Sequence, residues 1–180
     1  MPDHFGILYL LRRDIIQCLG KNPNGRANLG VPAIWPGAMA ILAGIDLLAK
    51  YLAGNDASGG VGPRFRCFVH KYFGPISAGD EETVYQLRNA LLHSFGLYSE
   101  RLSKKGVVTK FRFVLSFQIT VKGSPLVMDL GHDSYMIDVA ELHNRFEAGV
   151  CAFQADVDRD AALQMNFEKM FVKYGSIHIG

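Results

Sequence analysis

A six-residue stretch, Arg88-Asn89-Ala90-Leu91-Leu92-His93, carries the side chains best suited to chemistry in this 180-residue chain. Arginine binds phosphate through a planar fork of N–H donors, and histidine gives or takes a proton near neutral pH. An RNA strand carries its own nucleophile, the 2′-hydroxyl, so a base, a cation and a proton donor can together cleave it. We therefore predict that His93 transfers the proton and Arg88 clamps the phosphate, while Asn89 orients the histidine or bonds the phosphate.

The spacing of this pair leaves two arrangements open. Residues five apart lie about 140° apart around a helix, so Arg88 and His93 do not stack, whereas Asn89 and His93 share a face. The long arginine can still meet His93 at one site, or the two can meet across the two-fold axis of a homodimer. Alternatively both are structural, with Arg88 paired to a carboxylate such as Asp46 and His93 favoured by the dipole at the helix C-terminus.

The stretch from Tyr85 to Gly96 resembles the motif helix of the HEPN superfamily, in which an arginine is followed by a polar residue, three further residues and a histidine. Arg88, Asn89 and His93 match that pattern. The resemblance implies a homodimeric helical bundle and, in many members, RNA cleavage without a metal ion. Other members are inactive, so the alternative function is a non-catalytic module, an adaptor or a toxin–antitoxin component with a protein partner.

Five other residues require an explanation. Asp46 lies in the apolar segment 36–53, where a carboxylate without a partner is costly. It can pair with Lys50 one turn later, or it can hold Arg88 or His93 in position, a placement that resembles the acidic residue on an earlier helix in HEPN members. Arg64 and Lys71 are weaker candidates for a phosphate-binding surface. The two aromatic side chains that follow the motif, Phe95 and Tyr98, are expected in the core, although either could stack on a base.

Hydrophobic periodicity predicts helices over 4–19, 36–53, 64–73 and 138–156, with further helices beginning at Asp80 and after Asp160. Strict alternation over 110–121, followed by short apolar runs at 126–130 and 135–137, predicts strands. We therefore predict one mainly α domain over 1–180. Its up-and-down helical bundle spans 4–98 and 138–175, and an antiparallel β-meander lies at 107–137, before the last two helices. The resemblance to the HEPN superfamily implies that the bundle is HEPN-like and that the meander is an insertion in it.

Composition limits the classes of function. Hydrophobic residues make up 49% and charged residues 20%, which is typical of a globular protein, and the net charge of +2 argues against a generally basic surface.

Three separated cysteines without a CxxC pair predict free, mostly buried thiols. His132, Asp133 and His143 match no zinc spacing, so neither a metal site nor a cofactor is expected. The apolar stretch 38–53 is short and contains two charges, and the N-terminus lacks the order of a signal peptide. We expect a cytoplasmic protein that binds RNA and no membrane.

Overall fold

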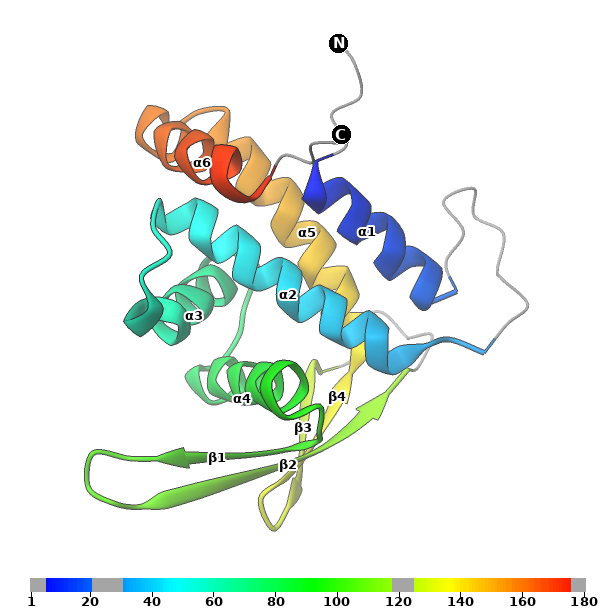
Figure 1. Cartoon of the computed structure of the whole chain (residues 1–180). Helices are drawn as coiled ribbons and strands as arrows, with labels where there is room; N and C mark the ends of the chain where they lie inside the picture. The colour runs from blue at the N-terminus through cyan, green and yellow to red at the C-terminus, as the bar shows by residue number, and fades with distance from the viewer. Residues whose placement is uncertain (1–5, 21–30, 118–124, 176–180) are drawn as a thin grey trace.

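The computed structural model describes residues 6–20, 31–117 and 125–175, in which helices surround a central helix and a small sheet lies at one side (Figure 1). Helices account for 63% of the structure, which confirms the prediction of a mainly α fold. The α-helices of the described ranges are α1 (Ile7–Cys18), α2 (Ile34–Ala53), α3 (Val61–Tyr72), α4 (Ala78–Ser94), α5 (Val139–Val157) and α6 (Ala161–Tyr174).

The central helix is α2, which contacts each of the other five helices. Ile41, Ile45 and Leu48 on this helix are fully buried, as expected for a helix that is apolar on most sides. Within the described ranges, α2 is the one helix whose length and mean hydropathy of 1.3 would suit a membrane span, and half of that apolar window is buried inside the fold. The buried half of this window forms part of the core.

Local capping explains where several helices begin. Asp138 Oδ1 accepts the N–H of Ala140 at 2.9 Å at the start of α5, and Asp160 caps α6 in the same way, as predicted. The predicted start of the fourth helix at Asp80 is wrong. Ser77 takes the cap position instead, because its Oγ accepts the Asp80 N–H at 3.0 Å and α4 begins at Ala78.

The sheet differs from the predicted antiparallel meander. Its strands are β1 (Tyr98–Leu102), β2 (Val108–Ser116), β3 (Val127–Gly131) and β4 (Ser134–Asp138), in the order β1-β2-β4-β3. β1 pairs antiparallel with β2, and β3 with β4, but β2 and β4 run parallel, so the sheet is mixed. It also begins at Tyr98 rather than at 107. The end of the predicted long strand, 118–121, lies outside the described residues.

The alternation in β2 has the predicted consequence of one buried and one exposed face. Phe111 and Phe113 are each 5% exposed and pack toward the helices, where Phe111 stacks on Tyr135 with ring centroids 5.6 Å apart. Arg112 and Val114, between and beyond them, are exposed. Helix α4 lies along β1 and β2 on the buried side (Figure 1). The sheet therefore supports the helix that carries Arg88 and His93.

Gly44 allows α2 to approach its neighbours closely, because a Cβ there would lie 2.8 Å from Phe146 Cζ and 2.9 Å from Leu11 Cδ2. We predict that Gly44→Ala lowers the free energy of unfolding by about 1–2 kcal/mol, since overpacking outweighs the improved helix propensity. Gly79→Ala is the matched control, because its Cβ would meet only Ser77 Oγ at 3.6 Å. Urea denaturation measures both, and equal stability of the two variants would contradict the prediction.

Candidate functional site

An ion pair between α4 and α2 anchors the site. Arg88 Nε donates to Asp46 Oδ2 at 2.7 Å, and Arg88 Nη2 lies 2.5 Å from the same oxygen. The two side chains are only 10% and 17% exposed, so removing either partner would leave a largely buried charge. Lys50, the other partner considered for Asp46, instead lies over the ring of Tyr174, 4.3 Å from its centroid. Asp46 therefore positions Arg88.

The other terminal nitrogen of Arg88, Nη1, contacts the two remaining motif residues, Asn89 and His93. Arg88 Nη1 donates to Asn89 Oδ1 at 3.1 Å and to Nε2 of His93. The long side chain of Arg88 thus reaches His93 within one chain, although the two residues do not share a face of the helix. Because a guanidinium has no acceptor, Nε2 of His93 must accept, and in this arrangement the neutral ring carries its proton on Nδ1. Asn89 contacts the arginine rather than the histidine.

The two halves of the motif differ in their exposure to solvent. Arg88 is 9% exposed, whereas His93 lies in the last turn of α4 and is exposed.

Phe95, which ends the helix, is 73% exposed and has a φ of 47°, a left-handed conformation that costs a non-glycine residue about 1–2 kcal/mol. Tyr98 is 42% exposed. The expectation that both aromatic residues lie in the core is wrong, because the helix ends before Phe95 and the chain turns outward.

The two weaker candidates, Arg64 and Lys71, are separated by the fold. Arg64 lines a pocket of about 160 Å³ together with Arg88 and Asp46. Lys71 does not line it, because its Nζ lies 2.9 Å from Asp156 Oδ2 and it packs over the ring of Tyr72. The structure therefore brings Arg64, and not Lys71, to the neighbourhood of Arg88.

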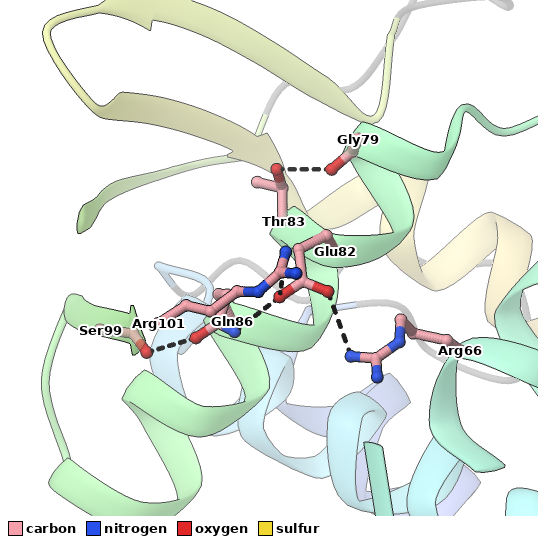
Figure 2. Close-up of polar contacts among 7 residues, drawn as sticks. All are labelled: Arg66, Gly79, Glu82, Thr83, Gln86, Ser99 and Arg101. Atoms are coloured by element: carbon pink, nitrogen blue, oxygen red, sulfur yellow. Dashed lines mark hydrogen bonds and ion pairs between the residues drawn. The ribbon is translucent and has the colours of Figure 1, made fainter. Parts of the chain in front are cut away.

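A second polar network fixes the β-hairpin beside α4 (Figure 2). Glu82 accepts a hydrogen bond from Arg66 of α3 at 3.1 Å and lies 3.5 Å from Nη1 of Arg101 of β1. Gln86 donates to Glu82 at 2.8 Å and accepts from Ser99 Oγ at 2.6 Å. The residues of this network are not predicted from the sequence. Its one local signal is the i,i+4 spacing of Glu82 and Gln86.

Metal ligands and thiols give no further site in the described ranges. No group of three or more His, Cys, Asp or Glu side chains there is arranged to hold a metal ion. Cys18, Cys67 and Cys151 are free, and Cys67 and Cys151 are exposed, so the expectation of mostly buried thiols is wrong. The arrangement that can act chemically is the cluster of Asp46, Arg88, Asn89 and His93, which we call the Arg88 cluster.

We predict strong coupling between Asp46 and Arg88 in a double-mutant cycle. Because the pair is largely buried, the two alanine variants and their combination should give a coupling energy of about 1–3 kcal/mol in chemical denaturation. The exposed pair of Arg13 and Asp14, 2.7 Å apart, is the control and should give less than about 1 kcal/mol. Equal coupling in both pairs would show that the Asp46–Arg88 pair does not hold α4 to α2.

Comparisons of the chain with protein-family models, with curated proteins and with solved structures found no match. The resemblance of 85–96 to the HEPN motif helix therefore rests on the motif residues alone and stays a prediction.

Proposed function

We propose that this protein is an RNA-binding protein of HEPN type that cleaves RNA without a metal ion at the Arg88 cluster, as a homodimer. The observation that carries the proposal is the contact between Arg88 Nη1 and Nε2 of His93, made by a buried cation to an exposed imidazole. It joins a group that stabilises negative charge to a group that moves protons, at a surface that substrate can reach.

The proposed reaction uses the 2′-hydroxyl of the RNA as the nucleophile. A phosphate that replaces the imidazole on Arg88 Nη1 would release Nε2 of His93, which then accepts the 2′-hydroxyl proton. The 2′-oxygen attacks the phosphorus, the bond to the 5′-oxygen breaks, and the imidazolium returns a proton to that 5′-oxygen. The products are a 2′,3′-cyclic phosphate and a 5′-hydroxyl. Such general acid–base help contributes about 10²–10⁴-fold in rate.

The distribution of charge supports binding to RNA. The β1–β2 hairpin carries five exposed cationic side chains and a single carboxylate, Glu100, although the whole chain has a net charge of only +2. The cations are Arg101, Lys104, Lys105, Lys110 and Arg112. A cluster of this kind supplies the sequence-independent part of nucleic-acid affinity. β1 begins five residues after His93 and runs back along α4, so that Ser99 contacts Gln86 and Arg101 contacts Glu82. The cations of the hairpin therefore follow α4 from the candidate site toward the N-terminal end of the helix.

One observation favours the alternative function, a non-catalytic module. The guanidinium of Arg88 has five N–H groups, and its contacts with Asp46, Asn89 and His93 engage four of them. An arginine this fully engaged can be structural, with His93 forming part of a binding surface for a protein partner. The two functions differ in whether the protein breaks a phosphodiester bond.

Cleavage by His93 gives the most direct test of the enzyme. Purified protein incubated with mixed RNA in excess chelator should produce fragments ending in a 2′,3′-cyclic phosphate, and His93→Ala should lower the rate at least about 10²-fold because the proton-transfer group is lost. His70→Ala is the matched control, since His70 is exposed on α3 and pairs with Glu81 outside the cluster. Equal rates for His93→Ala and wild type, with both proteins folded, would support the non-catalytic module.

Phe95 should contribute to RNA affinity by stacking on a base near His93. Stacking of a base on an aromatic ring is worth about 1–3 kcal/mol, so we predict that Phe95→Asn weakens RNA binding by roughly tenfold, measured by fluorescence anisotropy. Asparagine tolerates the left-handed conformation of this position, which separates loss of the ring from loss of the helix end. Phe95→Trp, which keeps an aromatic plane, should bind as wild type. Unchanged affinity in Phe95→Asn would exclude the stacking role.

A further inference from the structure

The pocket beside the Arg88 cluster contains cations that the fold does not neutralise. It lies where the end of α2 meets the start of α3, and five of its lining side chains are charged: Asp46, Lys50, Asp56, Arg64 and Arg88. Its volume of about 160 Å³ is roughly ten times that needed for one water molecule. A polar ligand of several heavy atoms therefore fits inside.

Both carboxylates of the pocket already have cationic partners. Asp46 pairs with Arg88. Asp56 lies 2.5 Å from Lys173 Nζ and accepts a hydrogen bond from the Tyr174 hydroxyl, also at 2.5 Å. These two contacts, with Lys173 the larger cause, lower the pKa of Asp56 to about 2, so its charge is engaged and fixed at neutral pH. Neither carboxylate is available to neutralise the remaining cations.

The remaining cations are Arg64 and Lys50, and neither has a carboxylate partner within the described residues. Arg64 is 9% exposed, and its Nη1 donates to Asn55 Oδ1 at 3.0 Å and to the Ala57 carbonyl at 2.8 Å, both neutral acceptors. Lys50 Nζ lies over the ring of Tyr174. A largely buried guanidinium without a counter-ion is unusual, because burial of an unpaired charge is costly.

Comparison of the two arginines in the pocket shows which edge of Arg64 is vacant. Arg88 uses Nε and Nη2 to hold Asp46 Oδ2. In Arg64 the same two nitrogens make no hydrogen bond to the described residues, and neither is sealed from solvent. This edge of a guanidinium is one of the two that can bind two oxygens of a phosphate in parallel. The fold holds Nη1 in place and leaves the bidentate edge open.

We propose that this pocket binds a phosphate group, held by the Nε and Nη2 edge of Arg64 and by Lys50. The site stands apart from RNA cleavage, since neither residue takes part in proton transfer. The phosphate belongs either to the end of an RNA strand or to a small phosphate-bearing ligand. Both sources offer the same chemistry, a compact dianion with several acceptor oxygens that matches two cations converging on one cavity.

The test measures binding of 2′-O-methyl RNA, which lacks the nucleophilic hydroxyl and so cannot be cleaved. Fluorescence anisotropy compares the affinities of internally labelled strands that carry a 5′-phosphate, a 3′-phosphate or hydroxyls at both ends. Calorimetry measures the binding of inorganic phosphate. We expect inorganic phosphate to bind. Lys50→Met and Arg64→Lys should weaken phosphate binding by about tenfold, the loss expected when a charge-assisted contact is removed.

One further variant, Gly60→Ala, and a control outside the pocket complete the test. Arg64→Lys keeps the charge and removes the fork, and Gly60→Ala moves the fork without changing any charge, because its Cβ would lie 2.5 Å from Arg64 Nη1. Lys71→Met, outside the pocket, is the control and should bind as wild type. Thermal denaturation confirms that each variant is folded.

Each outcome decides the proposal. A preference for phosphorylated RNA ends that is lost in the pocket variants supports the site and assigns it to RNA. Binding of inorganic phosphate that depends on Arg64 and Lys50, without a preference for RNA ends, supports the site and assigns it to a small ligand. No phosphate binding, or binding that is equal in all variants, overturns it. Loss of cleavage in His93→Ala with phosphate binding retained separates this site from the proposed ribonuclease.

Discussion

The ion pair between Arg88 and Asp46 is the interaction on which the rest of the candidate site depends. It joins α4 to the central helix α2, and it does so through the Nε and Nη2 edge of the guanidinium. Because Asp46 contacts Nε and Nη2, the remaining nitrogen, Nη1, contacts Asn89 and His93. A buried charge thereby fixes the orientation of an exposed imidazole, because rotating the arginine would leave Asp46 with no cation to balance it.

The same pair also explains why a separate phosphate site is assigned to Arg64 and not to Arg88. Arg88 uses Nε and Nη2 for Asp46, so only Nη1, which contacts Asn89 and His93, can reach a substrate phosphate. Arg64 presents the equivalent edge of its guanidinium without an internal anion, and Lys50 lies in the same pocket. One pocket therefore contains an arginine occupied by the fold and an arginine open to a ligand.

The sequence predicted the helices well because each depends on local signals. Asp138 and Asp160 are N-caps whose carboxylates accept the backbone N–H groups two and three residues further on, and α2 is apolar enough to identify as central. The pairing of β2 with β4 was not predictable, because alternation along β2 determines which face is buried and not which strand lies beside it. β1 was missed because Glu100 and Arg101 interrupt its pattern on an exposed edge, and its position depends on contacts with Gln86 and Glu82 that are remote in sequence.

The candidate site was predicted in part for similar reasons. The motif identified Arg88, Asn89 and His93 as chemical groups, and the cost of a carboxylate in an apolar helix identified Asp46 as a residue needing a partner. The sequence could not choose between Lys50 and Arg88 as that partner, since both are cations within reach. It also could not distinguish Arg64 from Lys71, because whether a cation has a counter-ion is determined by helices packed from elsewhere in the chain.

The central claim is that Arg88 holds Nε2 of His93 and yields it to RNA, and nitrogen NMR of histidine-labelled protein tests it most directly. We expect that in the free protein His93 carries its proton on Nδ1 with Nε2 accepting a hydrogen bond, and that 2′-O-methyl RNA changes the Nε2 signal. A proton on Nε2 in the free protein, together with signals that saturating RNA leaves unmoved, would contradict the account.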